Sequence, residues 1–261
     1  MKDNRQSVSA PLELITDPAE KARREVENGV RQFNQAVELI REHVRNPERP
    51  FRLRSSHILM LHKAAMEGIH QLAGTFRNTS VAIRGSRHQP PEAFLVAEHV
   101  EHLCTYVNEN WDSNALHLTA YVLWRLNWIH PFADGNGRTS RVVSYVILNI
   151  KSDSILPGSP TIPEQIAANK RPYYEALELA DDAWAQRQEV DVTALEAMLD
   201  SYLAKQLVNA AEAARARIRK GRQTAGTSTC GQDSGNSKRV ARSRSDILVP
   251  RLSSSAHPRT L

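Results

Sequence analysis

The sequence predicts a mostly α-helical protein, a helical bundle with one short β-hairpin that forms a flap. Apolar residues recur at three- and four-residue steps along most of the chain up to residue 219, which is the period of amphipathic helices. Segments 114–129 and 142–150 are apolar on nearly every side, as expected of helices at the centre of a bundle. The β-like run at residues 80–83 is followed by Gly85, Ser86 and a Pro-Pro pair, which predicts a flap over 75–89.

Start and stop signals give the expected bounds of the helices. Asp17 is a suitable N-cap and Pro18 suits the first helical position, so the first helix should span 18–45. The second helix should start at Ser55 or the next residue and should stop at Gly74. Further helices are expected over 91–108, 114–129, about 136–150, 163–186 and 191–219.

Composition narrows the class of protein. The chain has 261 residues, of which 41% are hydrophobic, and this is enough for a substantial core. No apolar run approaches the ~18 residues of a membrane span, and the first residues lack the apolar segment of a signal peptide. The two cysteines, Cys104 and Cys230, are not expected to form a structural disulfide. We therefore expect a cytoplasmic protein, and export as an effector stays open.

The basic character of the chain is concentrated at its C-terminal end. Residues 211–261 hold 11 Lys/Arg and 3 Asp/Glu, whereas residues 1–210 hold 23 basic and 26 acidic side chains. The body is mildly acidic and is not expected to bind nucleic acid or a membrane. The tail loses its periodicity from about Gly221 and is expected to be disordered and solvated. Binding of nucleic acid, an anionic membrane or a secretion receptor by this tail is the alternative.

The stretch IHPFADGNGRTSR, residues 129–141, lies at the joint between the two most apolar helices. Gly135 and Gly137 let the backbone approach a ligand closely, because no side chain obstructs their N–H groups. The first N–H groups of the helix that starts here form a ready anion site. Arg138 and Arg141 are one helical turn apart, so both can reach oxygens of a phosphate bound there.

Two further side chains complete a candidate site in this stretch. Asp134 is the one carboxylate of the loop, and Mg²⁺ usually binds nucleotides through one or two carboxylates together with phosphate oxygens. His130 ends the preceding helix, and its imidazole can act as a general base at neutral pH. The set predicts transfer of a phosphorus-centred group from a Mg-nucleotide to a hydroxyl. An ordinary turn with a capping histidine is the alternative, although arginines buried at such a joint are costly without anions.

The segment HPFADGNGRTSR resembles the signature of Fic proteins, His-Pro-Phe-x-Asp/Glu-Gly-Asn-Gly-Arg-x-x-Arg, and fits it at every fixed position. The apolar helix before it, the flap segment VAIRGSRHQPP and the later RPYYEALELAD also resemble segments of that family. The resemblance covers roughly residues 50–205. It implies an N-terminal helical extension at 1–49, a Fic domain with a helical bundle and flap at 50–210, and a basic tail at 211–261.

The resemblance implies a protein adenylyltransferase that uses ATP. His130 would deprotonate a Ser, Thr or Tyr hydroxyl of a target protein, which attacks the α-phosphate so that AMP is transferred and pyrophosphate leaves. Asp134 would hold Mg²⁺ as the cofactor, and Phe132 would anchor the loop. Arg138 and Arg141 would bind the terminal phosphates. The nucleotide-binding residues implied are Ile83, Arg84, Gly85, Ser86, Asp134, Gly135, Asn136, Gly137, Arg138, Thr139, Ser140, Arg141 and Tyr173, with Gly135, Asn136 and Gly137 as the anion hole.

The flap, about Ile83 to Ser86, is implied to line the nucleotide site and to pair with an extended segment of the target by strand addition. Tyr173 or Tyr174 matches a position near the adenine, and packing within the bundle is the alternative for both. Gly137 stands where a variant of the family that phosphorylates its target has lysine. This difference favours AMP transfer over kinase chemistry.

The pair Glu67-Gly68 resembles the end of an inhibitory motif of the family, Ser/Thr-x-x-x-Glu-Gly/Asn, with Lys63 in place of the Ser/Thr. The resemblance implies that Glu67 pairs with Arg141 and prevents productive placement of the γ-phosphate, so Glu67→Gly should raise self-AMPylation. A Lys63–Glu67 pair on a solvated helix face, worth ~0.3–0.5 kcal/mol, is the alternative. The same glutamate supports removal of AMP in some relatives, and the sequence does not separate the two uses.

Several alternatives stay open from the sequence alone. The enzyme could transfer another nucleotide or remove AMP, and outside enzymes an ATP-binding regulatory module without turnover fits less well because His130 is intact. The first helix could support a homodimer instead of packing on the domain. The histidines His57, His62 and His70 are spaced by five and eight residues and do not share one helix face, so no structural metal site is expected.

Overall fold

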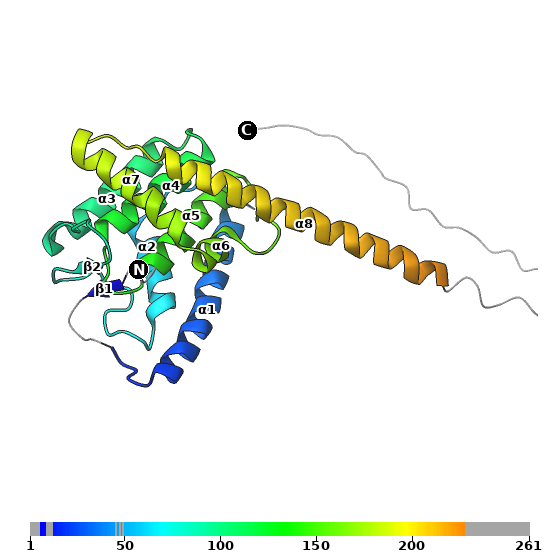
Figure 1. The fold of residues 1–261 in the computed structure, drawn as a ribbon, viewed down its shortest axis with the longest axis horizontal. Coiled ribbons are helices and arrows are strands. Elements are labelled where there is room, and N and C mark those ends of the chain that lie inside the picture. The colour runs from blue at the N-terminus through cyan, green and yellow to red at the C-terminus, as the bar shows by residue number, and fades with distance from the viewer. Residues whose placement is uncertain (1–5, 9–12, 45, 47, 49, 228–261) are drawn as a thin grey trace, which may run out of the picture. The chain divides into compact units, whose positions relative to one another are not determined.

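The computed structural model describes residues 6–8, 13–44, 46, 48 and 50–227 and confirms a mostly α-helical fold (Figure 1). The elements in chain order are β1 (Gln6–Val8), α1 (Pro18–Val44), α2 (Ser55–Met66), β2 (Ala82–Arg84), a 3-10 turn (Ala93–Leu95), α3 (Val96–Glu109), α4 (Ala115–Ile129), α5 (Asn136–Lys151), α6 (Ile162–Ala168), α7 (Arg171–Arg187) and α8 (Thr193–Thr227). The described residues up to 216 form one compact unit, which carries the site described below. None of the helices in the described part of the chain is long and apolar enough to cross a membrane.

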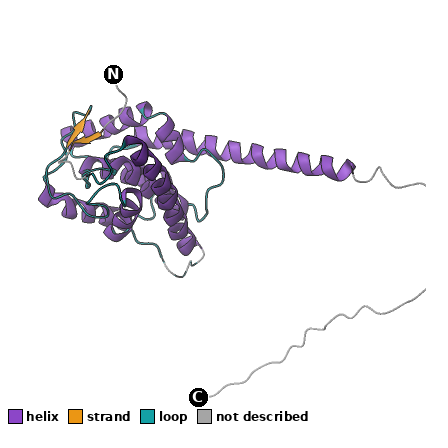
Figure 2. Cartoon of the chain, turned by 90° about the horizontal axis from the view of Figure 1, so that it is seen from below, coloured by secondary structure: helices purple, strands orange, loops and turns teal. Residues whose placement is uncertain are grey.

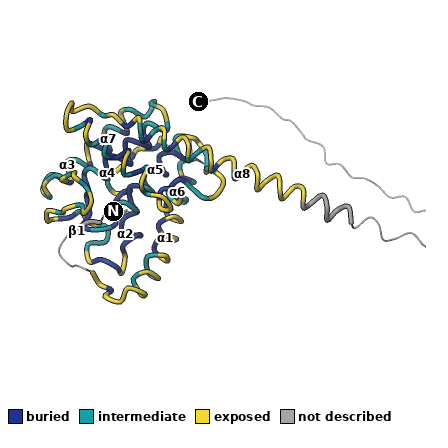
Figure 3. Tube along the Cα trace, in the orientation of Figure 1, coloured by how far each residue is buried: buried dark blue, intermediate teal, exposed yellow. Residues whose placement is uncertain are grey.

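The helices α4 and α5 form the centre of the compact unit, as their apolar sequences predict. They pack side by side, α1 and α2 contact α5, and α3 and α7 contact α4. Figure 3 shows the buried part of the trace running through these central helices. Leu123 and Trp124 of α4 and Ile147 of α5 are fully buried, and α1 adds Ala36 and Ile40 to the same core. α1 therefore packs against α2 and α5 of the same compact unit.

The second helix is shorter than predicted. α2 ends at Met66, and the chain then turns through Gly68, which has a φ of +74° that favours glycine. Residues 67–74 consequently form a series of turns before the flap. The prediction that this helix extends to Gly74 is wrong, because the helix ends before Gly68.

Two later boundaries also differ from the prediction. The expected helix at 163–186 is two helices, because Asn169 leaves helical geometry (φ −141°, ψ 97°) and Pro172 lies at the start of α7. The last helix extends beyond residue 219 and ends at Thr227. The disorder predicted for the tail concerns mainly residues 228–261, which lie outside the described part.

The flap is not a hairpin of its own, which corrects the sequence prediction. β2 pairs antiparallel with β1, in the register Gln6–Arg84, Ser7–Ile83 and Val8–Ala82 (Figure 2). A turn follows β2, in which Ser86 N donates to Ile83 O (3.1 Å) and Gly85 has a φ of +80°. The flap is one short strand, and its partner comes from a part of the chain more than 70 residues away.

Candidate functional site

The loop between α4 and α5 is held in shape by side chains within it and by α2. Asn136 closes the loop, because its Oδ1 accepts from Phe132 N (2.9 Å) and its Nδ2 donates to Phe132 O (2.8 Å). The buried ring of Phe132 stacks on His62 of α2, with centroids 3.6 Å apart. Nδ1 of His62 accepts from Gly74 N (3.0 Å), so its Nε2–H donates to Asp134 O (3.0 Å). His62 thus ties the loop to α2, and sequence reasoning missed this role.

The two glycines of the loop have different structural roles. Gly135 has a φ of +78°, and a Cβ there would lie 2.8 Å from Met66 Sδ of α2, so the loop requires glycine at this position. Gly137 lies in the first turn of α5, where a Cβ would be 3.3 Å from Arg141 Nη1. Because Gly135 is the N-cap and has no side chain, the first N–H groups of α5 face the cavity without a side-chain cap. This end of α5 can bind an anion.

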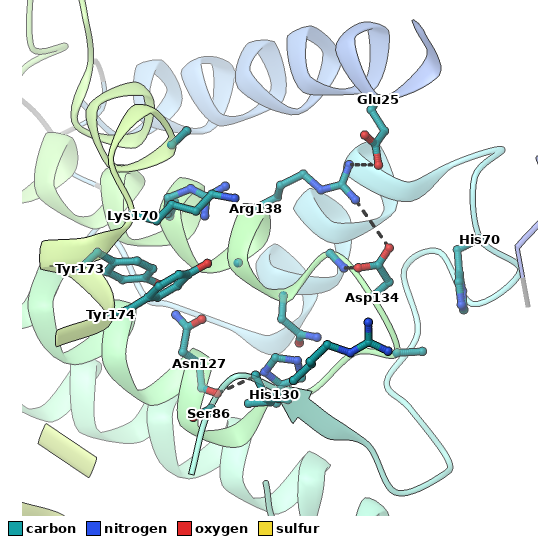
Figure 4. Close-up of a pocket in the computed structure, with 18 of the residues that line it drawn as sticks. Glu25, His70, Ser86, Asn127, His130, Asp134, Arg138, Lys170, Tyr173 and Tyr174 are labelled. Atoms are coloured by element: carbon teal, nitrogen blue, oxygen red, sulfur yellow. Dashed lines mark hydrogen bonds and ion pairs between the residues drawn. The ribbon is translucent and has the colours of Figure 1, made fainter. Parts of the chain in front are cut away.

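Three cations surround the start of α5. Arg138 Nη1 lies 3.4 Å from Glu25 Oε1 of α1, and its Nη2 lies 3.8 Å from Asp134 Oδ2 (Figure 4). Burial lowers the pKa of the Arg141 guanidinium, and Tyr173 and Tyr174 offset part of this decrease. No described carboxylate lies within ion-pair distance of Arg141. Burial and the charge of Arg141 also lower the pKa of Lys170, the residue that precedes α7. An anion with several negative charges would relieve this repulsion.

His130 is a titratable group at the other end of the loop from Arg138, where α4 ends. It caps α4 in the left-handed conformation (φ 50°), and its side chain is buried. Burial lowers its pKa to about 4, although the carbonyl of Asn127, 3.4 Å from Nδ1, favours the protonated form. The imidazole is therefore neutral at pH 7 and able to accept a proton.

Arg77 holds the backbone of this histidine from outside the loop. Its Nε donates to His130 O (2.8 Å), its Nη2 donates to Pro91 O (2.5 Å), and its backbone N donates to Pro131 O (2.9 Å). The side chain is almost fully buried. Sequence reasoning missed Arg77, because only the fold shows that these carbonyls converge on one side chain.

A cavity of about 1180 Å³ brings these groups together, with walls from α1, the flap, the loop, α5 and α7 (Figure 4). Most of the predicted site residues line it, namely Ile83, Arg84, Ser86, His130, Asp134, Gly135, Asn136, Gly137, Arg138, Arg141 and Tyr173. Glu25 and Lys170 also line it, and neither was singled out from the sequence. The cavity therefore joins a proton acceptor, a carboxylate and an anion-binding helix end.

Three predicted nucleotide contacts are not on the cavity wall. Thr139 and Ser140 lie on the inner face of α5, where both are buried and Ser140 Oγ accepts from Asn127 Nδ2 (2.9 Å). Gly85 forms the turn after β2 and does not line the cavity. The helical period explains the positions of Thr139 and Ser140, because only one side of the first turn of α5 can face the cavity.

The structure does not show the predicted pairing of Glu67 with Arg141. Glu67 is the C-cap of α2, its Oε2 lies 2.7 Å from Arg31 Nη1 of α1, and it does not line the cavity. The alternative pair with Lys63 does not form either, since Arg31 takes the carboxylate. The early end of α2 places Glu67 outside the cavity, and the carboxylates that lie beside an arginine of α5 are Glu25 and Asp134, both next to Arg138.

Comparison with known proteins gives a consistent result. Residues 52–148 match the model of the Fic/DOC family. The chain is 34% identical over 134 residues to "Protein adenylyltransferase Fic" of Drosophila grimshawi, and 33% identical over 131 residues to the protein of the same name from Drosophila persimilis. These alignments cover 48% of this chain but 25% and 23% of the relatives, so the matched region spans about a quarter of their length.

Solved structures show the same fold at low sequence identity. A Fic domain containing signaling protein from Bacteroides thetaiotaomicron has a TM-score of 0.57 at 20% identity, covering 72% of this chain and 73% of that one. Fic-1 from C. elegans has a TM-score of 0.53 at 21% identity, covering 81% of this chain and 55% of that one. At these identities the likeness concerns the fold.

Proposed function

We propose, from the premise that this chain belongs to the Fic/DOC family through residues 52–148, that it transfers AMP from ATP to a hydroxyl group of a protein. The observation that carries the proposal is the placement of a neutral, buried His130 on the same cavity as the uncapped start of α5. One group accepts a proton, and the other binds phosphate. The names of the curated relatives support the same reaction class.

The reaction requires one proton acceptor and a held triphosphate. The target hydroxyl oxygen would attack the α-phosphorus, and the proton would pass to the imidazole of His130. The bond between the α-phosphorus and the bridging oxygen would then break, so that pyrophosphate leaves with both electrons of that bond. Because Nδ1 of His130 faces the carbonyl of Asn127, the nitrogen that accepts the proton would be Nε2.

The phosphates would lie against the start of α5. Its N–H groups would bind the phosphate nearest the reaction, and Arg138, Arg141 and Lys170 would neutralise the others. Tyr173 and Tyr174 form the part of the wall beside Arg141 and would contact the rest of the nucleotide. The lowered pKa values of Arg141 and Lys170 support this placement, since a bound polyanion would compensate both charges.

Asp134 remains the proposed ligand for Mg²⁺. Its Oδ1 accepts from Gly135 N (2.7 Å), which orients the carboxylate beside the start of α5. Among the described residues no group of three or more His, Cys, Asp or Glu side chains could enclose a metal ion. The donor set therefore fits a cation that binds one carboxylate and takes its other ligands from water and phosphate, as Mg²⁺ does. When bound there, Mg²⁺ would neutralise charge on the phosphates.

We also propose that a carboxylate restrains the activity, and that this carboxylate is Glu25 and not Glu67. The Glu25 carboxylate pairs with Arg138, so it occupies a guanidinium that a phosphate would otherwise use. Both side chains are partly exposed, so the pair is weak enough for ATP to displace it. Glu25 would therefore lower the affinity for ATP and would not block the site completely.

Incubation with ATP labelled at the α- or the γ-phosphate tests the proposed function. We expect label on protein from the α position only, and about 10²–10⁴-fold slower labelling with His130→Ala. Label from the γ position would indicate a kinase instead. If ATP binds in calorimetry but no variant incorporates α-label on any protein of a lysate, an ATP-binding module becomes the better interpretation.

A further inference from the structure

β2 lies on the rim of the cavity and has two edges, one of which pairs with β1. Ile83 and Arg84 of β2 line the cavity together with His130. Backbone groups of successive strand residues point to opposite sides. The carbonyl of Ile83 accepts a hydrogen bond from Ser86 N in the turn after β2, on one side of the strand. The backbone N–H and C=O groups of Ala82 and Arg84 therefore face the other side, where β1 lies. The edge toward β1 is therefore the one at which an extended segment can add.

We propose that this edge is an exchangeable docking site, that residues 6–8 are its resident occupant, and that a target segment binds by displacing them. The proposal rests on the AMP-transfer function proposed above, because a target must reach the same rim of the cavity. The partner it fits is an extended peptide segment without proline, since such a segment must donate backbone N–H groups. β1 meets this description, with the sequence Gln-Ser-Val.

The pairing of β1 with β2 is short enough to exchange. It spans three residues on each strand, and within the described part of the chain the sheet has no third strand. Isolated two-stranded pairings are marginally stable in water. An uncovered strand edge, in turn, is a template for any other extended chain. The occupant can therefore leave the edge, and another strand can replace it.

The segment that follows β1 is anchored independently of β2. Glu13 forms a β-bridge with His70, and Leu14 N donates to Ile69 O (2.8 Å). Ile15 is buried in a small apolar cluster with Ala65, Met66 and Ile69. Because this anchor begins five residues after Val8, β1 stays near β2 even when it is displaced. Its effective concentration is then on the order of millimolar, so that weak pairing suffices for occupancy and a target needs longer or stronger pairing.

Hydrogen exchange tests whether β1 occupies the edge. The variant carries proline at all three positions of β1 (Gln6→Pro, Ser7→Pro and Val8→Pro) and loses every donor of the strand. The matched control carries alanine at the same positions and keeps all backbone N–H groups. We expect the amides of Ala82 and Arg84 to exchange about tenfold faster in the proline variant than in the control, the scale of one lost backbone hydrogen bond. Equal exchange in the two variants would overturn the proposal.

Photo-cross-linking tests whether a second segment takes the vacated place. The probe is a synthetic peptide of residues 4–10 with a photoreactive group, supplied at millimolar concentration to the full chain. We expect cross-links to residues 82–84 in the proline variant to exceed those in the alanine control and the wild type severalfold. Equal yields would show that the edge does not exchange its occupant. Neither measurement uses ATP, so a failure here is separate from a failure of the proposed AMP transfer.

Discussion

The segment at residues 130–141, which comprises the loop and the first turns of α5, and the N-terminal part of the chain, through Glu13, Thr16 and Glu25, border the same cavity, but only the first could be identified from the sequence. The loop carries its chemistry in consecutive residues, and its shape depends mainly on contacts within it and with α2. The N-terminal segment acts through single residues that meet distant partners, such as Glu25 beside Arg138 and β1 beside β2. The groups for reaction are thus encoded locally, whereas the groups proposed to control access depend on tertiary contacts.

The largest effect is expected for His130→Ala, which tests the local half of this contrast. A positioned general base contributes about 10²–10⁴-fold to a rate, so AMP transfer should fall by that factor. ATP affinity measured by calorimetry should stay close to that of the wild type, because the phosphates are placed against α5. Transfer that persists within threefold of wild type would remove His130 from the reaction.

Replacing the glycines of the loop one at a time should separate shape from chemistry. Gly135→Ala combines a φ of +78° with a Cβ 2.8 Å from Met66 Sδ, and it should lower the free energy of unfolding by about 1–3 kcal/mol. Gly137→Ala meets only the flexible end of Arg141 at 3.3 Å and should cost less than about 1 kcal/mol. Urea unfolding of both variants measures this difference. Equal losses would contradict the proposed role of α2 in shaping the loop.

The pH dependence of kcat/KM should show the effect of burial on His130. Its pKa is lowered to about 4, so the neutral form that accepts a proton persists as the pH falls, and is lost only near the lowered value. At pH 5.5 an unperturbed histidine would be about one-tenth neutral, whereas a group with a pKa near 4 stays almost fully neutral. We expect less than a twofold loss attributable to this group between pH 7.5 and about 5.5. An acidic limb with a midpoint near 6.5 would contradict the burial argument.

The smallest effect is expected for Glu25→Gln, which tests the tertiary half of the contrast. Removing the carboxylate beside Arg138 should lower the KM for ATP by about two- to fivefold, the range for a partly exposed ion pair. Glu67→Gln is the matched control, because its partner Arg31 lies outside the cavity, and its KM should be unchanged. A larger effect of Glu67 than of Glu25 would restore the inhibitory role that the sequence suggested for Glu67.

Those features that depend on local pattern could be predicted from the sequence. The apolar runs identified α4 and α5 as the central helices, and the spacing of Gly135, Arg138 and Arg141 indicated an anion site at the start of α5. Along the flap, composition indicated a strand near residue 83 but gave no information on its partner. A single sequence shows neither long-range pairing nor which glycine ends a helix, so β1 and the early end of α2 were missed.

The residues missed at the site share a physical reason. Lys170 precedes a helix, Glu25 lies within one and is partly buried, and Arg77 belongs to a loop, so none has a distinctive neighbour in the sequence. Each is recognisable only when the fold brings it to the cavity or to the carbonyls around His130. Glu67 is the opposite case: a short sequence motif marked it, but in the structure it follows the last residue of α2 and pairs with Arg31.

The chain reverses direction after His130, so the C-terminal end of α4 and the N-terminal end of α5 both border the cavity. α4 ends there with its carbonyls, at the negative pole of its dipole, and α5 begins six residues later with its N–H groups, at the positive pole. A substrate between them would experience a fixed field along the line from phosphate to hydroxyl. The backbone itself would then help draw the proton one way and the departing negative charge the other, whatever side chains a distant homologue uses to assist.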